Sequence, residues 1–320
     1  MKHLIYPLLI FVAMPLLLAS CSNDMEGVEE TVQVTFRAEI PGNIMTRAEA
    51  EEGAADNSAE VTTSTYPVNQ LVCAVFENGT EIGALRQTID LSKVTGENIE
   101  YSPALIKGRS YQIAFWACDK DAYNVTDMKN ITQVAQCDAF TATASTGTVT
   151  GAFTQQVTLT RPFAQLNMGV TEADWNAVEN GFKLEPSSTT VTVSNCYNAY
   201  NAVEGKGVGE PSTQTYTCTS TGSDLVVGET TYKSLFMDYL LVANDSETHT
   251  VTYTIKAEGV AINGSNGLAI SNVPLKTNCK TNIVGTLMTG TAEYTITISE
   301  GFSADSNTVK VPAETNTDNQ

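Results

Sequence analysis

A period-two alternation of apolar and polar residues constrains this chain more than any other feature of its sequence. It is clearest between Thr31 and Ile40, where every second side chain is apolar. The apolar members are Val32, Val34, Phe36, Ala38 and Ile40, and the polar members are Gln33, Thr35, Arg37 and Glu39. Such alternation is typical of a strand with one buried face. Further segments rich in Thr, Val, Ile and Tyr favour strands; they are residues 110–118, 155–161, 164–170, 189–195, 248–257 and 293–301.

A hairpin turn signal and the small number of helix signals indicate that the chain is all-β. Asn78-Gly79 follows the apolar run Leu71 to Phe76 and predicts a hairpin, because both residues tolerate positive φ. Helical signals are confined to residues 170–181, with Thr171 as N-cap and Gly181 as stop, and to a turn or short helix over 124–134. We therefore expect two antiparallel β-sandwich domains with few short helices. Residues 31–160 and 161–320 form the two expected domains.

The N-terminus reads as a bacterial lipoprotein signal. Lys2 and His3 precede an apolar run that ends at Leu17-Leu18-Ala19-Ser20-Cys21, and residues 1–20 are predicted to be a cleaved signal peptide. The run is shorter than the roughly 20 apolar residues of a membrane-spanning helix. Cleavage between Ser20 and Cys21 would leave Cys21 as a lipidated first residue, held to a membrane by acyl chains such as palmitate at about 0.8 kcal/mol per buried methylene.

The charge of the chain argues against nucleic acid as a partner. The formal net charge is −19, from 17 basic and 36 acidic residues. Phosphate binding needs clustered Lys and Arg, and this sequence shows no such cluster. Residues 21–30 are predicted to be an acidic tether between the lipid and the first domain. An acidic stretch directly after a lipidated cysteine resembles the surface-export signal of Bacteroidetes lipoproteins.

The cysteines leave their redox state open. Six follow Cys21, namely Cys73, Cys118, Cys137, Cys196, Cys218 and Cys279. No C-x-x-C spacing points to zinc or to a thioredoxin-like motif. Cys118 with Cys137, or Cys196 with Cys218, would be possible disulfides in an exported protein. Cys73 and Cys118 lie in apolar runs, where buried thiols are the commoner state.

Catalytic chemistry finds little support in the sequence. The only histidine after the signal is His249, in a strand-like context that favours a surface or cross-strand role, and no G-x-S-x-G elbow accompanies it. The carboxylate pairs Glu51-Glu52 and Asp119 with Asp121 lie in loop-like segments without an aromatic cleft. The segment around Asp119 lacks the ligand spacing of a calcium loop. We expect no catalytic residue, no cofactor and no metal site.

Several landmarks together resemble the fimbrillin superfamily of Bacteroidales lipoproteins, the pilins of type V pili. They are residues 107–131, with a strand ending in Phe-Trp-Ala; residues 157–170, with Arg161-Pro162-Phe163-Ala164; and residues 278–290 with the closing strand 293–302. Each also has a plain structural reading. Phe115 and Trp116 would point to opposite faces of one strand, Arg161 would pin the domain junction, and Gly285 would mark a bulge or close backbone approach.

The resemblance implies an assembly mechanism. Fimbrillins are two-domain transthyretin-like sandwiches that an arginine-specific protease cuts at the cell surface. The cut removes the first strand, and a strand from the next subunit replaces it by β-strand addition. On this reading residues 31–47 are the removable strand and linker, with cleavage between Arg47 and Ala48 in an acidic segment open to a protease. Arg37 lies inside the strand and is the poorer substrate.

Two functions remain open from the sequence. The first is a pilus subunit or pilus-associated lipoprotein of the outer membrane, partnered by other pilins and supporting adhesion to a host or bacterial ligand. The second is a surface lipoprotein that binds glycan or host protein without polymerising. The resemblance implies a donor strand at the C-terminus of a shaft subunit, but after Phe302 this chain offers only "NTVKVPAE" and a polar tail, and Pro312 lacks a donor for strand pairing. A shaft, an anchor and a tip position therefore stay open.

Overall fold

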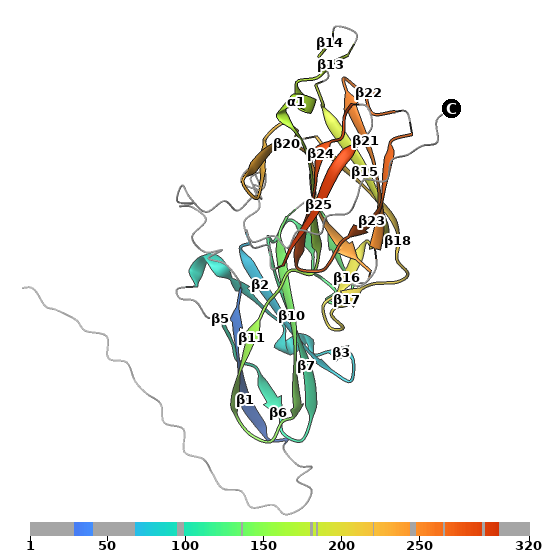
Figure 1. Cartoon of the computed structure of the whole chain (residues 1–320). Coiled ribbons are helices and arrows are strands. Elements are labelled where there is room, and N and C mark those ends of the chain that lie inside the picture. The colour runs from blue at the N-terminus through green and yellow to red at the C-terminus, as the bar shows by residue number, and fades with distance from the viewer. Residues whose placement is uncertain are drawn as a thin grey trace, which may run out of the picture.

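The computed structural model confirms an all-β fold (Figure 1). It describes residues 29–40, 68–94, 99–135, 137–179, 182–183, 185–219, 221–243, 248–264, 266–289 and 292–300. The strands fall into two groups set end to end, so that the molecule is elongated. We call residues 29–160 the N-terminal half and residues 161–300 the C-terminal half. Among the described residues, no helix is long and apolar enough to cross a membrane.

Two sheets face each other in the N-terminal half. In the first, β1 lies between β11 on one side and β5 and β6 on the other. In the second, the order is β10, β7, β2 and β3, with β4 also paired to β2. The bounds are β1 Thr31–Glu39, β2 Gln70–Glu77, β3 Thr80–Glu81, β4 Gln87–Asp90, β5 Ile99–Tyr101, β6 Ala104–Ile106, β7 Ser110–Cys118, β10 Ala139–Thr148 and β11 Phe153–Thr158. The predicted hairpin at Asn78-Gly79 is confirmed, since β2 pairs with β3 and both residues have positive φ.

Apolar side chains from both sheets fill the space between them. This N-terminal core contains Val34, Phe36 and Ala38 of β1 and Phe115 of β7, each with no exposed area. Trp116, the next residue along β7, is buried on the opposite face of the sheet. The predicted division of Phe115 and Trp116 between two faces is therefore confirmed, and both faces are buried.

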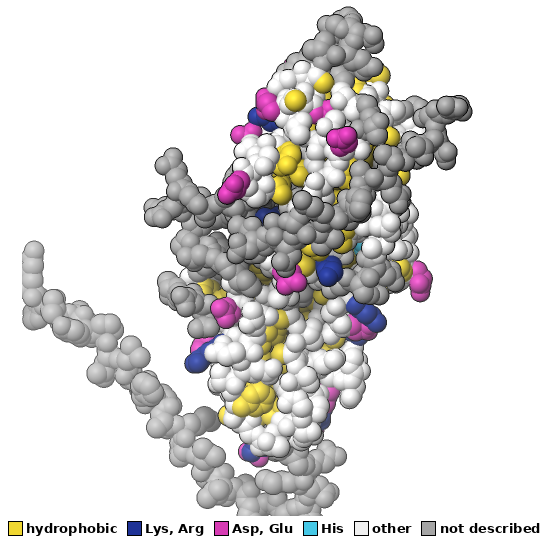
Figure 2. Space-filling view, in the orientation of Figure 1, with side chains coloured by type: hydrophobic (Ala, Val, Ile, Leu, Met, Phe, Trp, Pro, Cys, Tyr) yellow, Lys and Arg dark blue, Asp and Glu magenta, His cyan; other side chains and the backbone are white. Residues whose placement is uncertain are grey.

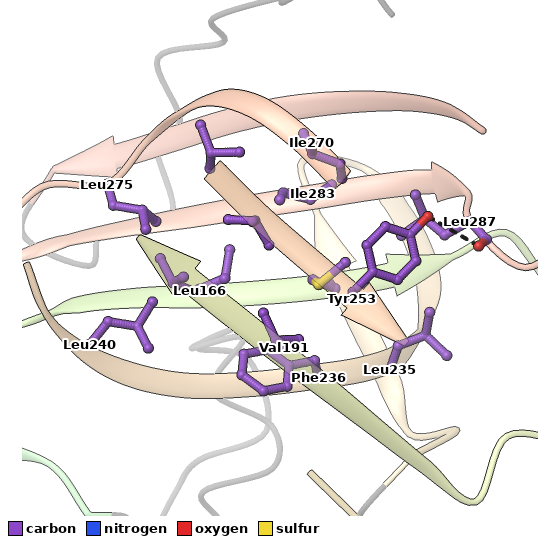
Figure 3. Close-up of a cluster of buried hydrophobic side chains, with 14 of the residues drawn as sticks. Leu166, Val191, Leu235, Phe236, Leu240, Tyr253, Ile270, Leu275, Ile283 and Leu287 are labelled. Carbon is purple, nitrogen blue, oxygen red and sulfur yellow. Dashed lines mark hydrogen bonds between the residues drawn. The ribbon is translucent and has the colours of Figure 1, made fainter. Parts of the chain in front are cut away.

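A larger sheet forms the C-terminal half. Its order is β22, β21, β15, β20, β12, β24 and β25, and β18, β19 and β23 pair with β15, β20 and β21. The bounds are β12 Ala164–Val170, β15 Ser188–Tyr197, β18 Ser212–Cys218, β19 Asp224–Val227, β20 Thr230–Val242, β21 Thr248–Ala257, β22 Val260–Ala261, β23 Leu268–Pro274, β24 Cys279–Thr286 and β25 Glu293–Glu300. Leu166, Phe236 and Tyr253 are among its core residues, and the Tyr253 hydroxyl donates to the Leu287 carbonyl at 3.2 Å (Figure 3).

Two pairings depart from the predicted antiparallel sheets. β1 runs parallel to β11, and β12 runs parallel to β24. A parallel pair cannot be closed by a tight hairpin, so each of these strands comes from a distant part of the chain. The close backbone approach predicted at Gly285 is confirmed, because a Cβ there would lie 2.1 Å from the carbonyl oxygen of Glu293.

The two halves share a small sheet at their junction. It has the order β17, β16, β9 and β8, with two strands from each half. The bounds are β8 Tyr123–Asn124, β9 Ile131–Gln133, β16 Ala199–Asn201 and β17 Lys206–Gly207. A third apolar cluster lies beside this sheet and joins Trp116 to Tyr200, with ring centroids 5.5 Å apart. The domain boundary near residue 160 stays a prediction.

The helical predictions were partly wrong. Thr171 is the N-cap of α1 (Glu172–Trp175), as predicted, but the helix ends near Asn176 and a β13–β14 hairpin (Val178–Glu179 and Phe182–Lys183) follows. Of the turn or short helix predicted over 124–134, the turn is present and is followed by β9. The other helical elements among the described residues are the 3₁₀ turns η3 (Gly83–Leu85) and η4 (Leu91–Lys93).

Candidate functional site

The candidate site is β1 together with the groove that holds it. The strand shows the alternation predicted from its sequence, since Val34, Phe36 and Ala38 are fully buried while Gln33 and Arg37 are exposed. Full burial of a Val or Phe side chain contributes roughly 1.5–3 kcal/mol. The buried face of β1 therefore contributes several kcal/mol to the N-terminal core.

Phe36 occupies the centre of the groove. Its ring centroid lies 6.3 Å from that of Tyr101 and 5.9 Å from that of Phe115, and these two rings meet edge to face at 6.3 Å. Distances of this size are typical of favourable aromatic pairs. Tyr101 comes from β5 beside β1, and Phe115 comes from β7 in the facing sheet. Phe36 therefore joins the two sheets.

Backbone hydrogen bonds hold β1 along both edges. On one side the Val34 amide donates to the Pro103 carbonyl at 3.1 Å, and on the other the Leu159 amide donates to the Glu39 carbonyl at 2.9 Å. Even-numbered residues thus face β5 and β6, and odd-numbered residues face β11. On the outer face, Arg37 Nε donates to Glu100 Oε1 at 3.0 Å. As predicted from the sequence, Arg37 lies within a strand, and its backbone is paired on the sheet.

A basic clamp holds the residues just before β1. The Lys107 ammonium pairs with Glu30, and the Arg109 guanidinium pairs with Glu29 and with Glu77. The Lys107 amide also donates to the Glu30 carbonyl at 2.8 Å. Hydrogen bonds to Glu29 and Glu77 raise the pKa of Arg109 above its usual value. Sequence reasoning missed this clamp, although two cations in the turn "KGR" opposite an acidic pair were a signal for it.

Four predicted site residues lie outside the part of the chain that the structure describes. They are Ser20 and Cys21 at the signal cleavage site, and Arg47 and Ala48 at the processing site. The described chain stops at Ile40, directly after β1, and resumes at Val68, before β2. Arg47 thus belongs to the connection between the first and second strands.

His249 and Asp119, two of the groups considered for catalysis, serve structural contacts, whereas Glu51 and Glu52 lie outside the described residues. His249 is buried and is not the surface residue that one reading allowed, but its contact is across strands, with Nδ1 2.8 Å from the Ser194 carbonyl. Asp119 accepts from the amide of Asp121 at 2.8 Å and from the side chain of Asn69. Within the described ranges, no group of three His, Cys, Asp or Glu side chains gathers in a way that could hold a metal ion.

Most of the described cysteines are also buried, with Cys218 partly exposed. Cys73, Cys118 and Cys196 carry free thiols, so neither Cys118–Cys137 nor Cys196–Cys218 is a disulfide in this structure. Burial raises the pKa of Cys118 to about 11 and that of Cys196 to about 12. Thiols with such pKa values carry almost no thiolate at neutral pH and are poor nucleophiles.

The surface gives no sign of an anion-binding face in the view of Figure 2. Lys and Arg side chains there are scattered singly among Asp and Glu, without a continuous basic patch. This distribution on the visible face agrees with the acidic charge of the whole chain.

The fold and the groove define an elongated all-β protein in which β1 is central to a sheet. Lys107 and Arg109 hold the residues just before β1, and the Leu159 amide binds the Glu39 carbonyl at its end. The chain belongs to a family of unknown function, DUF6562, whose model matches residues 25–317. No curated protein sequence matches it at a significant level.

Solved structures similar to this one come from Bacteroidales adhesins and fimbrial proteins. A candidate adhesin from Bacteroides thetaiotaomicron is 12% identical with a TM-score of 0.49, covering 90% of this chain and 100% of its own. The fimbrial anchor protein Mfa2 from Porphyromonas gingivalis is 13% identical with a TM-score of 0.45, covering 89% and 99%. The tip fimbrial protein Mfa3 of that organism is 14% identical with a TM-score of 0.40, covering 85% and 100%. These are the kinds of protein that the sequence resemblance implied, but similarity this low leaves the function to be argued from the chain's own residues.

Proposed function

We propose that this chain is a subunit of a cell-surface fimbrium, delivered to the outer membrane as a lipoprotein and assembled by exchange of its first strand. Lipidation at Cys21, after cleavage behind Ser20, would anchor the protein through its acidic tether. Cleavage between Arg47 and Ala48 would detach β1 from the rest of the chain. A strand from a neighbouring subunit would then enter the groove by β-strand addition.

The observation that carries this proposal is the position of β1. β1 is a central strand, paired with β11 on one edge and with β5 and β6 on the other. Removal of a central strand would leave a groove between its neighbours, whereas removal of an edge strand would only make the sheet narrower. An empty groove would expose Tyr101, Leu105 and Phe115 to water, along with two rows of backbone hydrogen-bonding groups. Exposed strand edges and apolar faces favour pairing with another chain.

The connection between β1 and β2 contains one candidate site for cleavage by an arginine-specific protease. Residues 41–67 connect β1 to β2, and they contain a single basic residue, Arg47. Arg37, with the same Arg-Ala-Glu context, lies in paired backbone. A protease specific for arginine would therefore separate β1 from β2 at Arg47 without needing to open the sheet.

The proposal is tested by the N-terminus of protein taken from the cell surface. Processed protein should begin at Ala48 and form a ladder of polymers on gels run without boiling. Arg47→Ala should abolish both, and the matched control Arg37→Ala should leave both intact. A lipidated Cys21 on a monomer as the final form would contradict the proposal and favour the non-polymerising surface binder for glycan or host protein.

A further inference from the structure

β18 is an edge strand of the large C-terminal sheet. It spans Ser212–Cys218 and pairs with β15, and among the described residues it has no other strand partner. In Figure 1 it lies at the right-hand margin of the C-terminal half. The backbone groups on its outer side therefore face away from the sheet, and an edge of this kind can pair with another chain.

β18 lacks the features that usually protect an edge strand from such pairing. Proteins blunt their sheet edges with short strands, charged residues, proline or bulges. The sequence of β18, S-T-Q-T-Y-T-C, contains neither a charged residue nor a proline. The register shift between β15 and β18 comes from an extra residue on β15, so β18 itself runs without a bulge.

The other described edge strands of this sheet are protected. β19 and β22 have only four and two residues. β23 ends in Pro274 and carries an extra residue relative to β21. β25 has a glutamate at each end, Glu293 and Glu300. Within the described part of the C-terminal sheet, β18 is therefore the long edge strand without a charge, a proline or a bulge.

The two faces of β18 differ. Thr213, Thr215 and Thr217 are exposed, whereas Tyr216 is half-buried and packs against the C-terminal core. On the exposed face, the hydroxyl of Thr217 already meets the hydroxyl of Thr190 of β15 at 3.2 Å. Because threonine pairs across strands stabilise sheets, the exposed face of β18 can offer the same kind of contact to a further strand.

From these features we infer that β18 pairs antiparallel with β18 of a second copy of this chain, about a two-fold axis at Thr215. Thr215 would lie opposite its own counterpart, and Thr213 would lie opposite Thr217 of the other copy, as in an isologous interface. A two-fold axis at Gln214 or Tyr216 would leave two residues of each β18 unpaired with the other. Full overlap of the two strands therefore selects Thr215 as the axis.

The charge of the chain favours this edge as the contact between copies. Two copies with a formal net charge of −19 each repel one another. An uncharged strand adds no carboxylates to the contact, and it offers no charge for a basic or acidic partner to recognise. The sequence Thr-Gln-Thr-Tyr-Thr is also nearly symmetric about Thr215, which suits a strand that pairs with itself.

The inference goes beyond the proposed function and does not depend on it, because β1 and β18 lie in different halves of the molecule. In a fimbrium assembled by strand exchange, the same pairing would join subunits of neighbouring fibres. One strand pair is a small contact, so isolated subunits should associate weakly. Many such pairs along two fibres would act together.

Cysteine cross-linking of the full chain tests the pairing and its register. Arg47→Ala in every variant keeps β1 attached, so that strand exchange cannot produce the cross-link. Thr215→Cys should form a disulfide-linked dimer under mild oxidation, because opposite residues of antiparallel strands have Cα atoms about 4.5–5.5 Å apart. Thr213→Cys is the matched control. Its counterpart would lie roughly 13 Å away along the strand, so it should link only when mixed with Thr217→Cys.

The outcomes separate this pairing from the proposed function. Linking of Thr213→Cys alone as fast as Thr215→Cys, or no linking of Thr215→Cys, would overturn the pairing. A linked Thr215→Cys dimer without any polymer ladder in the wild type would support the pairing and count against the proposed function. A wild-type ladder without linking of Thr215→Cys would contradict the pairing and leave the proposed function intact.

A charge series tests the same contact without cysteine. Thr215→Lys would place two ammonium groups opposite each other at the axis, so it should raise the dissociation constant of the dimer about fivefold in sedimentation experiments. Thr250→Lys is the matched control, since it changes an exposed threonine of β21 and the net charge equally. Mixing Thr215→Lys with Thr215→Glu should restore dimers. Equal dissociation constants for Thr215→Lys and Thr250→Lys, or a mixture that binds no more tightly than Thr215→Lys alone, would contradict the two-fold axis at Thr215.

Discussion

The ring of Phe36 lies 5.9 Å from the ring of Phe115 across the N-terminal core. Phe36 belongs to the first strand and Phe115 to the centre of the facing sheet. The strand that we propose to be cut away is therefore not a loosely attached extension. It is an integral part of the core, and a subunit that has lost it needs a replacement.

Truncation of Phe36 should measure how much β1 stabilises the N-terminal half. Phe36→Ala is expected to lower the free energy of unfolding by about 3–5 kcal/mol, because it removes a fully buried ring. Arg37→Ala, on the exposed face of the same strand, should change it by less than about 1 kcal/mol. Denaturant unfolding of the two variants provides the comparison, and equal effects would contradict the described burial.

The ion pair between Arg161 and Asp138 should matter far more than the surface pairs. Arg161 Nε lies 2.9 Å from both Asp138 carboxylate oxygens, Nη2 lies 2.6 Å from Oδ2, and the guanidinium stacks 4.6 Å from the Phe140 ring centroid. Arg161→Met should lower the free energy of unfolding by about 2–3 kcal/mol, since breaking a partly buried pair leaves the Asp138 charge partly desolvated. Arg161→Met with Asp138→Asn should cost less than the sum of the two single changes.

The matched control for that cycle is the exposed pair Lys206 with Glu204, whose side chains are 67% and 54% exposed. Its removal should change the free energy of unfolding far less than removal of Arg161, because exposed ion pairs contribute little. Urea unfolding of all the variants would show whether the junction depends on Arg161, and a cost at Arg161 no larger than that at Lys206 would refute it.

Asp238 should make the protein less stable as the pH rises towards neutrality. Burial raises its pKa to about 7 in the folded state, against about 3.9 in an unfolded chain. The folded state therefore binds the proton more tightly, so the stabilisation is complete below about pH 4 and is lost as the pH rises through 7. Between pH 5 and 8 the titration of Asp238 should lower the free energy of unfolding by about 1–3 kcal/mol.

Asp238→Asn removes that titration without changing the size of the side chain. The difference in unfolding free energy between wild type and variant should shift in favour of the variant by the stated amount from pH 5 to pH 8. Thermal or urea unfolding at a series of pH values gives this difference, and parallel profiles would show that Asp238 does not titrate in that range.

The strands could be predicted from sequence where local pattern alone determines them. The expected segments 110–118, 164–170 and 248–257 match β7, β12 and β21 residue for residue. In 110–118 and 248–257, β-branched and aromatic residues are frequent, as expected for strands, whereas 164–170 contains only one such residue, Val170. The burial of Val34, Phe36 and Ala38 followed from the same pattern.

Long-range contacts explain what the sequence did not reveal. The helix at Thr171 ends early, and the Asp174 carboxylate accepts from the amides of Leu287 and Met288 at 2.8 and 2.9 Å, more than 110 residues away. The sequence predicts a turn or short helix over 124–134 but not the strand β9 within it, because the partner strand of β9, β16, lies in the other half. The basic clamp was missed for the same reason, since Lys107 and Glu30 are 77 residues apart.

Locking β1 in place tests strand exchange most directly. Arg37 and Glu100 are opposite each other on β1 and β5, at a position where neither backbone hydrogen-bonds the other, which suits a cross-strand disulfide. The Arg37→Cys/Glu100→Cys variant, cut at Arg47 under oxidising conditions, should retain its first strand and form no polymer ladder. Reduction of the disulfide should restore the ladder. Polymerisation of the oxidised, cut protein at the rate of the wild type would contradict assembly by exchange of the first strand.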